Sequence, residues 1–306
     1  MTDTTFDPRR TQRLVILQHA GLLTPKHGKT GISLLRYRGD EVVAVIDREA
    51  AGRSLREITR LPLKRDIPIV ASVAEAMAFK PTALAIGLAP SGGRVPADWM
   101  DDLRLTVRSG VSIWSGLHTR LGEDAEIAAA LRPGVTIWDM RREPPGLASG
   151  TGGARNLPCK RVLFVGTDMA IGKMTAALEF DRAARERGVR SCFVGTGQAG
   201  ILISGQGVAL DAVRVDYAAG AVEAVVMAAA EGAGPRAWVL VEGQGSLAHP
   251  GSTATLPLLR GSQPTDLLLV HRAGQSHVRT RPGAAVVAIP PLPELITACE
   301  ALAFLA

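Results

Sequence analysis

The stretch VLFVGTDMAIGKMTAALEF, from Val162 to Phe180, contains an apolar strand, a glycine-containing turn and a Gly-Lys pair that opens a helix. Phosphate-binding loops have this order, because the N–H groups of the turn and the N-terminus of the helix both face the anion. Their usual spacing is G-x-x-x-x-G-K-[ST]. Here five residues separate Gly166 from Gly172, and Met174 occupies the position of the Ser or Thr that binds Mg²⁺. We therefore predict an anion cradle that departs from the ordinary ATP-binding loop.

This turn and the first turn of the following helix are expected to form the cradle. Gly166 and Gly172 let the backbone approach an anion closely, and Lys173 adds a full charge to the partial charge of the helix N-terminus. The residues that we expect to contact the anion are Gly166, Thr167, Asp168, Ala170, Ile171, Gly172, Lys173, Met174 and Thr175. Thr175 does not replace the missing hydroxyl, because one residue along a helix turns the side chain by about 100°.

A second Gly-Lys-Thr sequence, at 28–30, also precedes a helix. Leu23 stands where a phosphate-binding loop has its first glycine, and Pro25 stiffens the turn. We interpret this segment as the weaker candidate. It is either a phosphate loop or part of the lining of a cleft between domains.

Strand-like and helix-like segments alternate along the chain, which indicates an α/β protein with mostly parallel sheets. The expected strands are 13–18, 41–47, 67–72, 82–90, 110–116, 162–165, 191–195, 236–243, 266–272 and 284–289. Helices are expected at 31–38, 72–79, 218–234 and 293–305 and after the Gly-Lys pair up to Gly188, with a loop at 196–200. Ser72 and Glu75 have the spacing of a capping box at a helix start.

The length of 306 residues indicates two domains. A segment dense in Pro, Gly and Ser, 141–158, is typical of a connection between domains. We predict a Rossmann-like N-terminal domain over 1–145, a linker over 146–158 and a P-loop NTPase-like, doubly wound C-terminal domain over 159–306.

Composition restricts the partners and the cellular compartment. The chain is 46% hydrophobic and 21% charged, with a net charge of +6. Aromatic residues make up 4% and no run of Lys or Arg occurs, so we expect an acidic small metabolite as partner and no nucleic acid. We also expect a homo-oligomer.

The three cysteines form no C-x-x-C pair, which argues against a disulfide framework and a metal site. The polar N-terminus lacks the apolar segment of a signal peptide. No apolar run approaches the roughly 20 residues that span a bilayer. We predict a cytoplasmic protein that does not bind a membrane.

The segment VLVEGQGSLAHPG, 239–251, places Glu242 after an apolar strand. Ligands of doubly wound sheets bind at the carboxyl ends of the strands, so Glu242 is expected beside the turn that follows Val165. Glu242 and Asp168 are candidate bases. Gln198, in the glycine-rich segment 195–207, is a candidate donor to a substrate oxygen. These three are the predicted catalytic residues.

Four further residues are predicted to bind substrate. His118 and Arg120 follow a strand of the first domain, and Gln244 and His249 follow Glu242. A guanidinium such as that of Arg120 can donate hydrogen bonds to both oxygens of a carboxylate.

GTDMAIGK together with VEGQG is similar to dethiobiotin synthetase, which has the same spacing between its glycine and its Gly-Lys pair. A fuller set of segments resembles the DgcN-like family, long catalogued as a domain of unknown function: SGLHTRL, VGTDMAIGKM, GQAGILISGQGV, DAVRVDYAAGAVE, VEGQGSLAHPG and GSQPTDLLLVHRAGQ. They extend from Ser115 to Gln275. The resemblance implies a Rossmann-like domain followed by a P-loop domain, and N-acetylation of D-glutamate by acetyl-CoA.

Two differences from that family bear on these expectations. The first half, from HAGLLTPKHGKTG to AVIDREAAG, looks like a separate branch, so the acceptor substrate does not transfer directly. Relatives usually continue beyond the position of Ala306 by another strand–helix unit, so we expect a shortened C-terminal domain.

Three mechanisms stay open from the sequence. In the favoured one the cradle binds the phosphates of acetyl-CoA, needs no metal and therefore tolerates Met174. In the second, similar to dethiobiotin synthetase, ATP and Mg²⁺ bind, with Lys173 on the phosphates and Glu242 or Asp168 on the metal. In the third, the protein is a nucleotide-binding regulator without chemistry.

Overall fold

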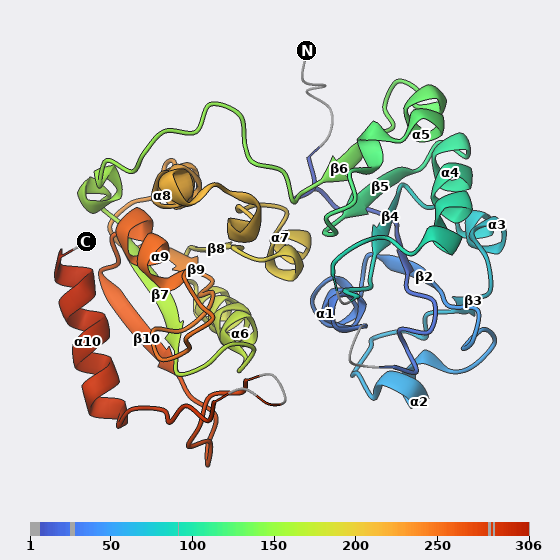
Figure 1. The fold of residues 1–306 in the computed structure, drawn as a ribbon. Helices are drawn as coiled ribbons and strands as arrows, with labels where there is room; N and C mark the ends of the chain where they lie inside the picture. Colours follow the sequence, from blue (N-terminus) through green and yellow to red (C-terminus); the bar gives the residue numbers. More distant parts are fainter. Residues whose placement is uncertain (1–6, 25–27, 91, 281–282, 284, 306) are drawn as a thin grey trace. The chain divides into compact units, whose positions relative to one another are not determined.

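The computed structural model describes residues 7–24, 28–90, 92–280, 283 and 285–305. The chain divides into two compact units, Met1–Arg141 and Arg142–Ala306. Each unit contains one parallel sheet with its own helices (Figure 1). The expected α/β class is confirmed.

The first unit is a six-stranded sheet with the strand order β3-β2-β1-β4-β5-β6, in which every pair of neighbours is parallel. This is the strand order of the Rossmann fold. Its elements are β1 (Leu14–Leu17), α1 (Lys29–Arg38), β2 (Val42–Ile46), α2 (Leu55–Thr59), β3 (Ile69–Val70), α3 (Val73–Ala76), β4 (Ala83–Ile86), α4 (Met100–Arg108), β5 (Ser112–Ser115), α5 (Ala125–Ala130) and β6 (Ile137–Asp139).

Alternating residues of these strands face two helical layers. Val15 and Leu17 pack in the cluster that holds Leu103 of α4. Strands covered on both faces are apolar at every position, which is why β1 contains no polar residue. The predicted capping box is confirmed at α3, where Ser72 Oγ accepts a hydrogen bond from Glu75 N at 3.3 Å.

The second unit is a four-stranded parallel sheet with the order β10-β7-β9-β8. Its elements are β7 (Lys160–Gly166), α6 (Lys173–Glu186), β8 (Ser191–Val194), α7 (Gln198–Ser204), α8 (Ala218–Ala229), β9 (Trp238–Val241), α9 (Thr255–Ser262), β10 (Asp266–Val270) and α10 (Leu292–Leu305).

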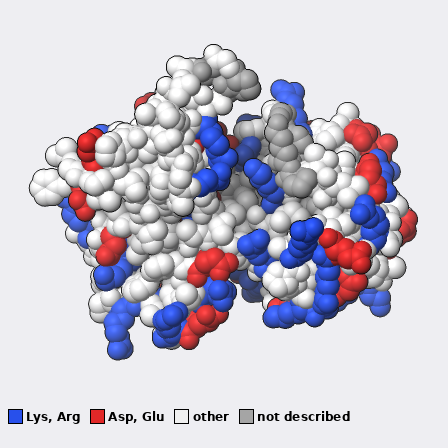
Figure 2. Space-filling model, turned by 90° about the horizontal axis from the view of Figure 1, so that it is seen from below, with Lys and Arg blue, Asp and Glu red and all other residues white. Residues whose placement is uncertain are grey.

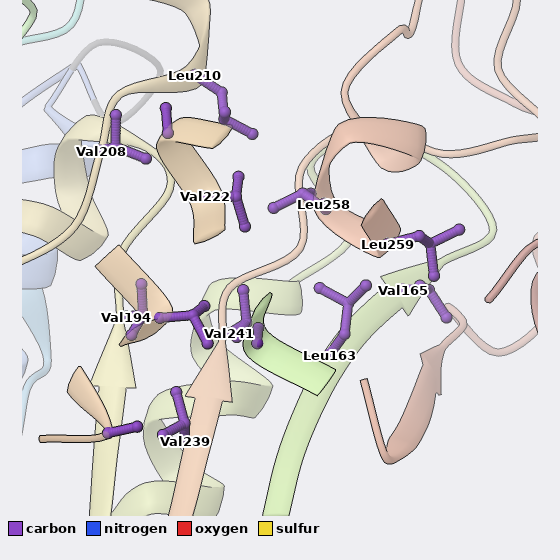
Figure 3. Close-up of a cluster of buried hydrophobic side chains, with 14 of the residues drawn as sticks. Leu163, Val165, Val194, Val208, Leu210, Val222, Val239, Val241, Leu258 and Leu259 are labelled. Atoms are coloured by element: carbon purple, nitrogen blue, oxygen red, sulfur yellow. The ribbon is translucent and has the colours of Figure 1, made fainter. Parts of the chain in front are cut away.

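The core of the second unit lies between its sheet and helices α8 and α9 (Figure 3). Leu163 and Val241 of the strands meet Val222 of α8 and Leu258 of α9 in this cluster. Phe164 points to the other face, where its ring packs edge-on against Phe180 of α6 with ring centroids 5.8 Å apart. The strands of this sheet are therefore covered by helices on both faces.

Two sequence predictions in the second unit are wrong. Residues 196–200 were expected to form a loop, yet α7 begins at Gln198. Residues 284–289, whose first residue lies outside the described part, were expected to form a strand, and Ala288 makes only a single antiparallel bridge, to His277. The side chain of Val286 is 79% exposed, so among the described residues of this run it is not buried against a sheet.

Glu223 of α8 holds the predicted linker to the second unit. Its carboxylate accepts hydrogen bonds from Thr151 N at 2.6 Å and Gly153 N at 2.6 Å. Burial acts to raise the pKa of Glu223, but the hydrogen bonds from the Thr151 hydroxyl and from the backbone N–H groups of Thr151, Gly153 and Gly152 outweigh it and lower the pKa.

On the face shown in Figure 2, basic and acidic side chains adjoin one another in several clusters, with broad uncharged areas between them. Ion pairs of the described residues include Arg182–Glu186 on α6, at 2.7 Å. In the part of the chain that the structure describes, no helix combines the length and the apolarity that crossing a membrane requires.

Candidate functional site

The turn between β7 and α6 has the backbone geometry of an anion cradle. Ala170 and Gly172 both have left-handed backbone conformations, with φ of 51° and 106°. Helix α6 starts at Lys173 with no side-chain cap and no acidic residue in its first turn. The N–H groups of that turn have no partner within the helix, so the helix start favours an anionic ligand.

Lys173 is buried, with 6% of the residue exposed, and its Nζ donates a hydrogen bond to the carbonyl of Asp168 at 2.8 Å. The ammonium therefore lies against the inner side of the turn. Burial disfavours its charge and lowers its pKa to about 8, although the carboxylates of Asp168 and Glu242 act in the opposite direction.

Glu242 directly follows β9, and β9 pairs with β7 in parallel. The expectation that Glu242 lies beside the cradle is thereby confirmed. Its residue is 4% exposed, and Oε2 accepts hydrogen bonds from Thr196 N at 2.9 Å and Gly197 N at 3.2 Å. Burial raises its pKa to about 7, against the opposing effects of these N–H groups and of Lys173.

Two glycines leave room for this arrangement. A Cβ on Gly200 of α7 would lie 2.2 Å from Glu242 Oε2, and a Cβ on Gly243 would lie 1.5 Å from the carbonyl oxygen of Phe164. Any side chain at position 200 would displace the carboxylate, and one at position 243 would push β9 away from β7. The site therefore requires glycine at both positions.

Asp168 connects the cradle to the segment after β10. Its Oδ1 accepts a hydrogen bond from Met169 N at 2.7 Å, and its Oδ2 accepts from Gln275 Nε2 at 2.7 Å and Arg279 N at 3.0 Å. Burial alone would raise the pKa of Asp168, but these hydrogen bonds outweigh it and lower the pKa. A carboxylate held in this way is a weak base and a stable anchor for the turn.

Arg272 and Arg279 lie on the rim of the cradle, a role that the sequence analysis did not anticipate. Arg279 Nη2 donates to the carbonyl of Ala170 at 2.8 Å, and Arg272 Nη2 approaches the same carbonyl at 3.5 Å. Both side chains are exposed. Arg272 comes two residues after the end of β10, which pairs with the P-loop strand β7, and that position was the available clue to it.

The other predicted site residues of this unit lie nearby. Gln244 Nε2 donates to Glu242 Oε1 at 3.3 Å, and Gln198 is the first residue of α7. His249 has backbone partners on both ring nitrogens: Gly251 N donates to Nδ1 at 3.0 Å, and Nε2 lies 3.2 Å from the carbonyl of Arg279. Substrate contacts of these side chains stay predictions, and the observed contacts of His249 are those of a positioning residue.

His118 and Arg120 belong to the first unit. His118 Nε2 lies 2.7 Å from Arg141 Nη1, and Arg120 pairs with Glu123 at 3.0 Å. Both contacts are with residues of the same unit, so substrate binding by His118 and Arg120 stays a prediction.

The cradle residues fit a phosphate group, because the helix N-terminus, Lys173 and two flanking arginines supply donors and positive charge on one side. They fit Mg²⁺ less well. Met174 offers no hydroxyl, and the oxygens of Asp168 already accept hydrogen bonds. Within the described ranges, the three acidic or histidine side chains close enough to hold a metal are His19, Asp47 and Glu49 of the first unit.

Comparison with known proteins agrees with both units. Residues 148–306 match the P-loop domain described as the C-terminal part of DUF1611, a domain of unknown function, and residues 48–143 match its Rossmann-like N-terminal part. A crystal structure of a DUF1611 family protein from Anabaena variabilis superposes with a TM-score of 0.84 at 55% identity, over 95% of this chain and 82% of that one.

Two curated relatives are named D-glutamate N-acetyltransferase. The protein from Pseudoalteromonas is 37% identical over 68% of this chain and 61% of its own length. The protein from Tritonibacter scottomollicae is 36% identical over 83% of this chain and 72% of its own length. The resemblance identified in the sequence is confirmed, and the chain belongs to the DUF1611 family, with a Rossmann-like N-terminal domain and a P-loop C-terminal domain.

Proposed function

We propose that this protein transfers the acetyl group of acetyl-CoA to the amine of an acidic amino acid similar to D-glutamate. The names of the two curated relatives support the reaction class. The observation that carries the proposal is Glu242, a buried carboxylate with a pKa of about 7 next to the cradle lysine. A general base is most effective when its pKa lies near the working pH.

The cradle residues 166–175 bind phosphate oxygens of coenzyme A through backbone N–H groups and Lys173. Arg272 and Arg279 approach the carbonyl of Ala170, and we propose that both side chains turn toward the phosphates of the cofactor. Because no metal is needed to bind these phosphates, Met174 is compatible with the reaction.

Glu242 takes one proton from the ammonium group of the acceptor. The free amine then attacks the thioester carbonyl carbon, so that a C–N bond forms and negative charge develops on the carbonyl oxygen. Collapse of this intermediate breaks the C–S bond, and the second proton of the nitrogen goes to the departing thiolate. Gln244 and Gln198 are proposed as donors to the developing oxyanion.

Asp168 orients the cradle rather than acting as the base, because its pKa is lowered and its oxygens accept hydrogen bonds from Met169, Gln275 and Arg279. His249 positions the segment after β10, because its Nε2 lies 3.2 Å from the carbonyl of Arg279. His118 and Arg120 of the first unit stay proposed substrate-binding residues, because a histidine and a guanidinium can bind a carboxylate. The net charge of +6 suits an acidic acceptor. A cytoplasmic location and a homo-oligomeric state are part of the same proposal.

The test is to incubate the protein with acetyl-CoA and a panel of acidic amino acids of both configurations, and to follow release of free thiol. A parallel reaction with Mg-ATP follows ADP. We expect amine-dependent thiol release and no ADP. ADP formation without thiol release would favour the phosphoryl-transfer mechanism, and tight nucleotide binding without either product would favour the regulator.

A further inference from the structure

The first unit contains a cavity at the amino-terminal edge of its sheet, opposite the strand ends at which Rossmann folds bind their ligands. Its volume is about 330 Å³, and it lies between the last turn of α1, the turn 39–41 and the segment 61–67. The turn leads into β2, and the segment connects α2 to β3. Cavities that bind small molecules start at about 300 Å³, so this one suits a small ligand.

The segment 61–67 that forms one wall of the cavity is anchored at two points. Arg65 Nη2 donates a hydrogen bond to the carbonyl of Val42 in β2, and Arg56 Nη2 of α2 donates to the carbonyl of Leu63 at 2.8 Å. Three apolar lining residues are at most 7% exposed and join the cavity to the packed interior: Leu35, Leu61 and Ile67. The cavity is therefore built into the fold of this unit.

Basic residues outnumber acidic ones in the lining. The four basic residues are Arg36, Arg38, Lys64 and Arg65, and the two acidic ones are Asp40 and Glu41. Arg38 pairs with Glu41 at 2.7 Å, and Lys64 pairs with Asp40. These two ion pairs offset two of the four positive charges, so the charges of Arg36 and Arg65 remain.

Arg36 and Arg65 are both exposed, and among the described residues neither has a carboxylate partner. Arginines elsewhere on the surface differ, since Arg104 and Arg182 each pair with an acidic residue of their own helix. A guanidinium has five N–H donors, so the hydrogen bond of Arg65 to a backbone carbonyl leaves donors for a ligand. Uncompensated cations around a cavity attract anions into it.

The end of α1 restricts the charge of the ligand. Its terminal carbonyl groups carry partial negative charge, which the basic residues Arg36 and Arg38 of the last turn offset. A ligand with a single negative charge gains little from this balance, whereas one with two or more anionic groups can contact Arg36 and Arg65 together. The cations surround a cavity rather than follow an extended surface, which favours a small molecule over a nucleic acid.

We propose that this cavity binds a small anion with two or more phosphate or carboxylate groups, held by Arg36 and Arg65. Both kinds of group match the planar fork of a guanidinium. The site is separate from the P-loop, and its existence does not depend on the acetyl transfer proposed above.

The test is calorimetric titration of the full chain with pyrophosphate and with citrate in separate experiments, at low ionic strength. The protein carries Lys173→Met, which weakens binding of pyrophosphate at the P-loop. We expect one equivalent of at least one probe to bind. Binding of pyrophosphate alone identifies a phosphorylated ligand, binding of citrate alone identifies a polycarboxylate, and binding of both identifies a site that recognises charge.

Variants of the two arginines assign the binding to the cavity. Arg36→Gln should weaken binding about fivefold or more, and it should fold because glutamine is a good helix former and the side chain is exposed. Arg65→Gln should weaken binding by a similar factor, with the melting temperature measured alongside because Arg65 also contacts Val42. Arg53→Gln is the matched control, because Arg53 is exposed in the same unit and lies outside the lining. It should leave the affinity unaltered.

Four results would overturn the inference. They are the absence of binding of both probes, an affinity that Arg36→Gln leaves unchanged, an equal loss of affinity in Arg53→Gln, and tighter binding of a short RNA duplex than of either probe. The last result would identify this region as a nucleic-acid surface.

Discussion

The two units each open a helix with a Gly-Lys pair after a strand, and the two turns use the lysine differently. In the second unit Lys173 is buried and folds back onto the carbonyl of Asp168. In the first unit Lys29 is exposed, and the buried polar group is Gln18 of the preceding strand end. The preceding glycine also differs, with φ of 106° at Gly172 and −81° at Gly28.

This difference shows that the sequence Gly-Lys does not define a phosphate cradle by itself. In the second unit the lysine, the left-handed turn and a carboxylate on the adjacent strand lie together, so binding and proton transfer can occur at one place. Among the described residues of the first unit, the corresponding helix start has no acidic residue in its first turn. We therefore expect the chemistry at the turn of the second unit.

The largest expected effect is that of Glu242→Gln. The glutamine keeps an oxygen for the N–H groups of Thr196 and Gly197 but cannot accept the proton, so turnover should fall by about 10²- to 10⁴-fold with little change in acetyl-CoA affinity. Initial rates of thiol release and calorimetric titration measure the two effects. Glu223→Gln, at a buried glutamate without a catalytic role, should lower the melting temperature while the folded fraction keeps its turnover. Equal losses in both variants would contradict the assignment.

Lys173→Met should weaken the binding of acetyl-CoA at the P-loop and leave the turn before α1 unaffected. The methionine retains the apolar stem beside Gly166 but loses the charge, which is worth about 1.5–3 kcal/mol in a charge-assisted hydrogen bond. We expect about 10- to 150-fold weaker binding of acetyl-CoA. Lys29→Met is the matched change at the other turn, and the comparison breaks down if it weakens acetyl transfer equally.

Gly200→Ala tests whether the packing of α7 against Glu242 positions the base of the second unit. A methyl group there would lie 2.2 Å from Glu242 Oε2, so the carboxylate or α7 must move. Overpacking of this kind costs about 1–3 kcal/mol of stability, and the displaced base should also lower turnover. Chemical denaturation and thiol release measure both quantities. At Gly234 a Cβ would meet no atom within 4 Å, so Gly234→Ala is the control, and similar behaviour of the two variants would argue against the constraint.

The smallest expected effect is that of Arg279→Gln. This side chain is 52% exposed, so solvent and salt screen its attraction to phosphate. We expect acetyl-CoA to bind about two- to fivefold more weakly at low salt, with the difference disappearing at high salt. A titration series in increasing NaCl measures this, and a difference that does not depend on salt would exclude a mainly electrostatic role.

Much of the fold and part of the site could be predicted from the sequence. Apolar runs, glycine turns and the Gly-Lys pair are local features, and the parallel arrangement follows from their alternation. The neighbourhood of Glu242 and the cradle also follows, because β9 and β7 end at the same edge of one sheet.

The remaining features depend on tertiary contacts. Glycine-rich sequence predicted a loop at 196–200, but Gly200 is needed so that α7 can pack against Glu242. The apolar run at 284–289 has strand propensity, yet its described residues make one isolated bridge, between Ala288 and His277. The partners of Asp168 come from Gln275 and Arg279, more than 100 residues away in the chain, and no local pattern links them.

The central claim is that Glu242 acts as the base beside the cradle lysine, and the pH dependence of kcat/KM tests it most directly. The reactive carboxylate accumulates as the pH rises through about 7, and the Lys173 cation is lost as the pH rises through about 8, so activity should be bell-shaped with its maximum between these values. In Glu242→Gln the residual activity should lose the acidic limb near pH 7. An acidic limb of unchanged position in that variant would contradict the claim.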